Sequence, residues 1–409
     1  MIVKEYIKAF EKLGFGMFVH FGVYSLRQRG EWYKDWVGRD DKEYENLYKA
    51  FNPDENWAKE LVATAKKAGC KYITLTTRHH DGFSLFDTCG LNTYDSVHGC
   101  GRDLVREFVD ECNAQGVIPF FYHTLLDWHE ESYQSDFKTY LQYLRDSVEI
   151  LCKNYGKIGG FWFDGMWNKP NDDWEEDALY GTIRKYQPNA MIINNTGLSA
   201  RGELGHIELD SVTFERGRPE PINMGDAPKY IASEMCQTMN DHWGYAKNDL
   251  SYKSLKSLIE DLCVCRRYGS NFLLNVGPMG NGLLRPLDKA MLEELGNWTA
   301  YNKEAVYLPR PTGIEITSKP QDFILEKDGT YYLFVHDLPM IGSPDVAMQF
   351  DYNPLDEFAF DKKIKSITAL EDASIVCAFE QKDGVVKINN PAYTYGNSLV
   401  VRVLKIETE

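Results

Sequence analysis

The chain has 409 residues, of which 43% are hydrophobic and 26% are charged. This is the composition of an ordinary globular protein, long enough for one barrel-sized domain and a smaller module. The formal net charge of −16 argues against nucleic acid or an anionic membrane as a partner, because both require a basic surface.

The N-terminal residues and the cysteines bear on location. Residues 1–8 contain no apolar run of the signal-peptide type, so we predict a cytoplasmic protein, or a secreted one if a signal peptide has been removed. No run reaches the ~18 apolar residues that span a bilayer. The nine cysteines are irregularly spaced and form no C-x-x-C pair, which predicts reduced thiols rather than a disulfide framework or a zinc ribbon.

Apolar segments that mostly alternate with helical patterns occupy residues 1–306. The expected strands are 15–22, 72–77, 117–123, 159–164, 191–195, 211–215, 231–239 and 271–276. The clearest helical pattern lies over 137–156, where apolar residues recur at helical spacing. No convincing helix precedes the sixth strand. Eight strands with fewer than eight helices predict an irregular (β/α)8 TIM-like barrel.

The pattern of apolar residues along the sequence changes after about residue 306. Short alternating runs follow at 323–326, 331–335, 364–370, 385–388 and 399–404. Turn dipeptides such as Asp-Gly and Asn-Pro separate them, which is typical of antiparallel strands. We therefore predict an α/β protein with two domains, a catalytic barrel over 1–306 and a C-terminal antiparallel β-sandwich over 307–409.

Polar side chains follow the apolar strands at their C-terminal ends. They are His20, His79, His80, Tyr122, His123, Asp164, Asn194, Asn195, Glu215, Glu234 and Asn275. A barrel collects such residues at one mouth, where active sites lie. Asp164 ends a buried run and is costly to bury unless it is paired or used, although Asp-Gly is also a common turn. Two carboxylates across a sugar are the machinery of glycoside hydrolysis.

Several of these residues also have interpretations other than sugar chemistry. His79 and His80 could bind a metal, but neighbours on a strand point to opposite faces unless a bulge turns them. No third ligand stands at metal-site spacing, so we expect no metal and no cofactor. His20 could be a hydrogen-bonded core residue. Glu215 and Glu234 could form salt bridges with nearby basic residues.

The chain resembles the α-L-fucosidases of glycoside hydrolase family 29 through several separated motifs. The motifs are residues 15–25, 31–33, 72–83, 162–165, 234–239, 243–245 and 271–278. They follow one another in the family's order over about residues 10–285. The C-terminal third matches only in architecture, since a β-sandwich usually follows the barrel in this family.

The resemblance implies a metal-free, retaining exo-hydrolase that removes terminal α-L-fucose from oligosaccharides or glycoconjugates through a covalent glycosyl-enzyme. Asp164 matches the nucleophile. The positions that match the fucose pocket are His20, Glu31, Trp32, His79, His80, Tyr122, Trp162 and Trp243, and Glu234 matches a glutamate that is either structural or pocket-lining.

The general acid/base varies in position within the family. Glu215 is the first choice because it ends the sixth strand after a long loop; Glu234 is the second and Glu220 the third. Well-known members carry an arginine after the fifth strand, where this chain has Asn-Asn-Thr-Gly at 194–197. Either Arg201 replaces it or no residue does.

Other functions remain open from the sequence. One is a related retaining glycosidase such as an α-L-galactosidase, and another is a catalytically inactive sugar-binding relative. A metal-dependent barrel hydrolase built on His79 and His80 is a third. Homo-oligomer formation is also left open.

Overall fold

The computed structural model describes residues 2–222, 224, 227–341 and 355–409. Compactness divides the chain into two units, the first made of Met1–Lys253 and Ser270–Glu293, and the second of Ser254–Gly269 and Glu294–Glu409. This division differs from the predicted boundary at 306 because helix α9 (Leu255–Arg267) contacts β9 (Arg310–Glu315) and β10 (Phe323–Lys327). A catalytic domain over 1–306 stays a prediction.

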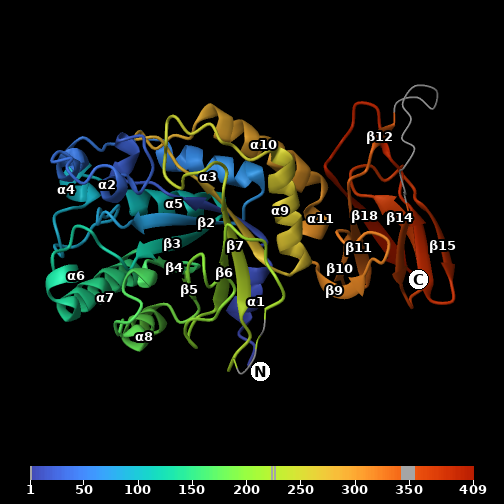
Figure 1. Cartoon of the computed structure of the whole chain (residues 1–409), viewed down its shortest axis with the longest axis horizontal. Helices are drawn as coiled ribbons and strands as arrows, with labels where there is room; N and C mark the ends of the chain where they lie inside the picture. The colour runs from blue at the N-terminus through green and yellow to red at the C-terminus, as the bar shows by residue number, and fades with distance from the viewer. Residues whose placement is uncertain (1, 223, 225–226, 342–354) are drawn as a thin grey trace. The chain divides into compact units, whose positions relative to one another are not determined.

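The first unit contains a closed barrel of eight parallel strands in chain order, as predicted (Figure 1). The strands are β1 Phe15–Val19, β2 Tyr72–Arg78, β3 Ile118–Thr124, β4 Gly160–Asp164, β5 Met191–Asn194, β6 Ser211–Glu215, β7 Ala232–Thr238 and β8 Asn271–Val276. Strand β8 pairs with β1 from Phe15 opposite Phe272 to Val19 opposite Val276. This last pairing closes the ring.

Helices lie outside the strands, as the ribbons of α3, α5, α7 and α8 in Figure 1 show. The α-helices are α1 Glu5–Glu11, α2 Tyr33–Trp36, α3 Trp57–Ala68, α4 Ser96–Cys100, α5 Leu104–Gln115, α6 Ser132–Ser135, α7 Phe137–Asn154, α8 Glu176–Tyr186, α10 Pro286–Tyr301 and α11 Lys303–Val306, and the 3-10 helices are η1 Val23–Leu26, η2 Tyr44–Lys49 and η3 Met166–Asn168. Helix α7 begins where the Asp136 side chain accepts from the Thr139 amide, a typical N-cap. Residues 195–210, between β5 and β6, contain no helix. The barrel is therefore irregular, as predicted.

Apolar side chains close the N-terminal end of the barrel. Ile7 and Phe10 of α1 pack into a buried cluster with Tyr72, Phe120 and Met191, which stand at or near the starts of their strands. Packed side chains of this kind make a barrel interior a core rather than a pore. A ligand therefore reaches the barrel interior from the opposite end, where the strands finish.

The second unit carries the antiparallel β-sandwich. A five-stranded sheet in the order β14-β18-β11-β10-β9 and a three-stranded sheet in the order β13-β16-β15 enclose a buried apolar cluster. Strands β12 and β17 form a separate parallel pair. Besides β9 and β10, the strands of this unit are β11 Thr330–His336, β12 Met340–Ile341, β13 Leu355–Ala359, β14 Ile364–Ala369, β15 Ala378–Lys382, β16 Val385–Asn389, β17 Tyr393–Thr394 and β18 Val401–Thr408. Asp328 and Gly329, both at positive φ, make the tight turn that joins β10 to β11.

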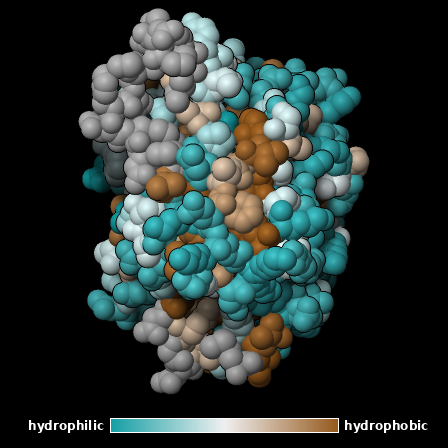
Figure 2. Space-filling model, turned by 90° about the vertical axis from the view of Figure 1, so that its right-hand side faces the viewer, coloured by the Kyte–Doolittle hydropathy of each residue, from teal (hydrophilic) through white to brown (hydrophobic). Residues whose placement is uncertain are grey.

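The surface in Figure 2 is mostly hydrophilic, with hydrophobic residues gathered in a band through its middle. Within the described part of the chain, no helix combines the length and the apolar character that crossing a membrane requires.

Candidate active site

A cavity of about 1280 Å³ opens where the barrel strands end. Ten of the eleven residues predicted from the sequence line it: His20, Glu31, Trp32, His79, His80, Tyr122, Trp162, Asp164, Glu215 and Trp243. Glu234 is the exception. Residues separated by more than 200 positions thus meet in one place, because a closed barrel brings all its strand ends to one rim.

Asp164 is the last residue of β4, and its carboxylate in the cavity wall accepts several hydrogen bonds. Its Oδ2 accepts from the Tyr122 hydroxyl at 3.1 Å, and its Oδ1 accepts from Trp167 Nε1 and Asn195 Nδ2, both at 3.2 Å. His80 Nε2 lies 3.5 Å from Oδ2. Burial alone raises the pKa of Asp164, but the His80 interaction and the Trp167 and Asn195 donors outweigh it, so the pKa lies below its ordinary value.

Gly165 turns the chain away directly after Asp164. Its φ is 105°, in the left-handed region that favours glycine. A Cβ at this position would lie 2.7 Å from the Leu126 Cβ and 2.8 Å from the Leu126 amide nitrogen. The amide of Leu125 also donates to the Asp164 carbonyl at 2.7 Å. The Asp-Gly pair is therefore a strand end fixed against the β3 loop, which holds the carboxylate at the rim.

Glu215 ends β6 and faces the same cavity. Its Oε2 accepts from Asn195 Nδ2 at 2.8 Å. Burial and the negative charge of Asp164 raise its pKa, against the opposing effects of Asn195, Arg216 and Arg201. Arg201 is itself exposed and donates from Nε to the main-chain carbonyl of Glu215, whereas Arg216 lines the cavity.

Asn195 joins the two carboxylates. Its Oδ1 accepts from the Thr213 hydroxyl at 3.0 Å and from the Gly197 amide at 3.2 Å, so its amide nitrogen must face Asp164 and Glu215. Because one nitrogen contacts both acidic side chains, the two contacted oxygens lie no more than about 6.0 Å apart. The sequence showed Asn195 only as a polar strand end, and its connecting role was not predicted.

A register shift between Thr76 and Arg78, where β2 pairs with β3, precedes the histidine pair. His79 and His80 follow directly after β2, which ends at Arg78, so the alternation of side chains along a strand does not separate them. Both rings line the cavity, with centroids 4.3 Å apart. Over the described ranges, no group of three or more His, Cys, Asp or Glu side chains is arranged to hold a metal ion.

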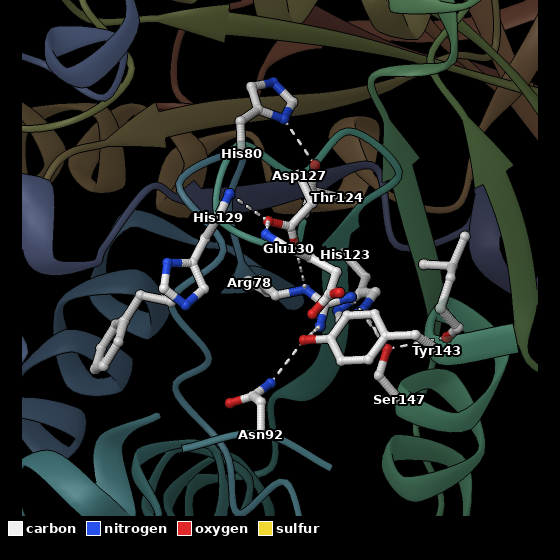
Figure 3. Close-up of polar contacts among 12 residues, drawn as sticks. Arg78, His80, Asn92, His123, Thr124, Asp127, His129, Glu130, Tyr143 and Ser147 are labelled. Atoms are coloured by element: carbon white, nitrogen blue, oxygen red, sulfur yellow. Dashed lines mark hydrogen bonds and ion pairs between the residues drawn. The ribbon is translucent and has the colours of Figure 1, made fainter. Parts of the chain in front are cut away.

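A network of polar side chains surrounds Arg78, the last residue of β2 (Figure 3). Arg78 donates from its terminal nitrogens to the Tyr143 hydroxyl at 2.9 Å and the Ser147 hydroxyl at 3.2 Å, and its Nε lies 3.8 Å from Asp127 Oδ2. Asp127 Oδ1 accepts from the amides of His129 and Glu130, at 2.8 and 2.9 Å. The network thus ties the end of β2 to α7 and to the loop after β3.

The same loop orients His80. The Thr124 hydroxyl donates to the Leu126 carbonyl, so its oxygen accepts from His80 Nδ1, 2.7 Å away. The amide of Trp128 donates to the His80 carbonyl at 2.8 Å. These contacts aim Nε2 at Asp164.

His20 and His79 are buried and uncharged. Burial lowers the pKa of His20 to about 3, and burial with the neighbouring imidazoles places the pKa of His79 well below its ordinary value. Asn275 donates to the Trp243 carbonyl at 2.7 Å, so its oxygen, 2.6 Å from His20 Nδ1, accepts the proton of that nitrogen. His20 therefore presents Nε2 as an acceptor.

Glu31 and Trp243 complete the wall. Glu31 accepts from the Gly244 amide at 2.7 Å, and burial raises its pKa despite that bond. The guanidinium of Arg216 lies 5.2 Å from the centre of the Trp243 ring, within reach of a cation–π interaction.

Glu234 stands inside the barrel, not at the cavity wall. It is the third residue of β7 and accepts from the Tyr72 hydroxyl and, at 2.9 Å, from Trp162 Nε1. Burial raises its pKa to about 7, although the two donors oppose the shift. Glu234 thus holds the indole of Trp162 in place from the barrel interior. Glu220, the third acid candidate, is exposed and lies outside the cavity lining.

The model of the α-L-fucosidase family matches residues 3–304. The chain belongs to the α-L-fucosidase family. It is 28% identical to tissue α-L-fucosidase from Bos taurus over 364 residues, which cover 80% of this chain and 74% of that protein. The residues that match the family contain the whole cavity.

Solved structures of fucosidases share the fold. Alpha-L-fucosidase isoenzyme 1 from Paenibacillus thiaminolyticus is 27% identical, with a TM-score of 0.80 and 99% of both chains covered. The α-L-fucosidase from Vibrio sp. strain EJY3 is 25% identical, with a TM-score of 0.83 over 100% of this chain and 73% of that one. The similarity to these two structures therefore extends over the C-terminal unit as well.

Proposed function

We propose that this protein is a retaining exo-α-L-fucosidase in which Asp164 is the nucleophile and Glu215 the general acid/base. The observation that carries the proposal is the amide of Asn195, which contacts both carboxylates and limits their contacted oxygens to about 6.0 Å apart. Retaining glycosidases hold their two carboxyl groups about 5–5.5 Å apart, whereas inverting enzymes need about 6.5–9.5 Å to admit a water.

In the first step, Asp164 attacks the anomeric carbon of an α-L-fucoside from the β face, while Glu215 gives its proton to the departing glycosidic oxygen. The lowered pKa of Asp164 favours the ionised nucleophile, and the raised pKa of Glu215 favours the protonated acid. The two environments thus push the carboxylates towards different roles. The product is a β-fucosyl ester of Asp164.

In the second step, Glu215 removes a proton from water as the water attacks the same carbon from the α face. Esterification has then removed the charge of Asp164, which had raised the pKa of Glu215. Glu215 consequently becomes ionised and can act as a base. The carbon–Asp164 bond breaks, and α-L-fucose leaves with its original configuration.

The cavity wall supports recognition of a single sugar. His20 and His79 are neutral, so they can exchange hydrogen bonds with hydroxyl groups without carrying charge. Such buried polar pairing discriminates strongly between sugars. The faces of Trp162 and Trp243 offer apolar surface for the C5 methyl group of fucose. The cavity opens at the mouth of the barrel, which favours removal of terminal residues.

The nucleophile is tested with Asp164→Gly on an aryl α-L-fucoside. We expect turnover to fall by several orders of magnitude while the fold persists. Added azide should then yield β-fucosyl azide, because azide replaces the missing carboxylate on the β face. Glu220→Ala, which changes an exposed carboxylate, is the control and should keep its activity. Near-normal turnover of Asp164→Gly would refute the assignment.

The acid/base is tested with Glu215→Ala on substrates with good and poor leaving groups. The rate should fall about 10²–10⁴-fold for poor leaving groups and much less for good ones. Azide should yield α-fucosyl azide, since it attacks the covalent intermediate from the side that water uses. If Glu234→Ala behaves in this way instead, the acid is Glu234.

A panel of aryl glycosides tests the sugar, because an α-L-galactoside differs from the fucoside only in a hydroxyl at C6. Preference for the galactoside would replace the proposed specificity. The expected substrate is a fucosylated oligosaccharide or glycoconjugate. The cytoplasmic location, the lack of nucleic-acid or membrane partners and the oligomeric state stay predictions.

A further inference from the structure

The cavity is larger than a single monosaccharide requires. Its volume of about 1280 Å³ exceeds the roughly 300–1,000 Å³ of a pocket for one drug-sized ligand. The proposed fucose pocket occupies its buried part, which includes His20, His79 and Trp162. The outer part of the cavity is therefore left for whatever is attached to the fucose.

Exposed apolar side chains gather at this outer part. Trp36 is 72% exposed, Leu250 76% and Trp167 39%, and all three line the cavity together with the exposed Val37 and Leu198. Single exposed apolar residues are ordinary, but a group of them around one concave site marks a binding surface. The neighbouring catalytic carboxylates identify which ligand reaches it.

Three of the tryptophans form a continuous row. Trp32 lies between the other two, with its ring centroid 5.8 Å from that of Trp167 and 5.3 Å from that of Trp36. The interplanar angles are only 28° and 30°, so the Trp32 indole lies within about 30° of parallel with each of its two neighbours. Trp167 also donates to Asp164, which joins the row to the reaction centre.

We propose that Trp167 and Trp36 form the subsite for the leaving-group sugar, with Trp36 as its outer platform and with Trp32, a residue expected in the fucose pocket, in contact with both. This proposal rests on the proposed function. The occupant is a neutral pyranose, a hexose or an N-acetylhexosamine, whose apolar C–H face packs on the indoles while its hydroxyls stay in water. Because packed side chains fill the opposite end of the barrel, this sugar can leave only through the mouth.

The platform predicts a difference between substrates with and without a second ring. The substrates are two disaccharides, fucosyl-galactose and fucosyl-N-acetylglucosamine, and α-L-fucosyl fluoride, whose leaving group is too small to stack. For Trp36→Ala, kcat/KM on at least one disaccharide should fall about three- to tenfold, while kcat/KM on the fluoride stays within about twofold of wild type. Trp36→Phe should recover part of the loss, because it restores an aromatic face.

The matched control is Tyr395→Ala, which removes an aromatic side chain that is 81% exposed and lies outside the cavity lining. It should leave both substrate classes unchanged. Equal losses on disaccharides and fluoride in Trp36→Ala would overturn the proposal, since Trp36 would then only hold Trp32 in place. Unchanged values on every disaccharide would overturn it too. A wild-type protein that leaves the fluoride intact contradicts the proposed function itself, so the two failures are distinguishable.

Discussion

The side-chain nitrogen of Asn195 lies 2.8 Å from Oε2 of Glu215. The same nitrogen lies 3.2 Å from Asp164 Oδ1, and the Thr213 hydroxyl and the Gly197 amide fix its direction. A donor shared in this way stabilises the ionised form of each carboxylate, and it lowers the pKa of both. Asn195 is thus a positioning residue for the proposed pair.

Asn195→Ala should shift the pH profile of kcat/KM to higher pH. The acidic limb reports the ionisation of Asp164 and the basic limb the deprotonation of Glu215. Both pKa values rise when the donor is lost, so both limbs move upward, by about one pH unit for a hydrogen bond to a charged group. The rate at the optimum should fall about tenfold or more. The profile is measured on an aryl fucoside.

The control is Asn194→Ala, which removes the adjacent amide. Asn194 donates to the Tyr180 hydroxyl at 3.0 Å and does not line the cavity. This variant should lose stability but keep the pH profile. A profile that is the same in Asn195→Ala and wild type would contradict the positioning role.

The barrel and most of the site could be predicted because burial leaves a direct trace in the sequence. A continuous apolar strand that ends in a carboxylate, as at Asp164, needs a partner or a function, and parallel strands bring their ends together. The direction of His80 could not be predicted, because it depends on contacts with Thr124 and Trp128, which are more than 40 positions away in the sequence. Glu234 is an interior residue because it stands in the third position of β7, one level below the rim.

Glu234 should make stability depend on pH. Its pKa is about 7 in the folded protein, above its ordinary value of 4.5, so between these values the folded state binds more protons than the unfolded state. The free energy of unfolding therefore falls as the pH rises from about 4.5 to 7, by up to about 3 kcal/mol. Glu234→Gln, which mimics the protonated carboxyl, should lack this decline. Denaturant unfolding at several pH values measures it, and identical pH dependence in both proteins would exclude the shift.

Gly165→Ala should impair catalysis and stability together. An alanine at φ 105° is strained, by about 1–3 kcal/mol, and its Cβ would clash with Leu126. The strain and the clash can be relieved only if Asp164 moves, so kcat should fall more than KM rises. Gly116→Ala is the control: its φ is 72°, and nothing lies within 4 Å of the added Cβ. It should lose about 1 kcal/mol of stability and no activity. If the two variants lose the same stability and activity, backbone strain alone explains the losses, and the position of Gly165 next to Asp164 does not contribute.

Asp127→Ala should destabilise the protein by about 3–5 kcal/mol. The substitution leaves the fully buried Arg78 guanidinium without the carboxylate 3.8 Å away, and it frees the amides of His129 and Glu130. Asp136→Ala is the matched control, because that aspartate also accepts a main-chain amide but caps an exposed helix end, where the loss of stability should be much smaller. Chemical denaturation compares the two.

Because the same loop holds the His80 carbonyl through the Trp128 amide, Asp127→Ala should also lower kcat. A loss of stability no larger than that of Asp136→Ala would mean that Arg78 finds other partners and that the network in Figure 3 does not support the histidine pair.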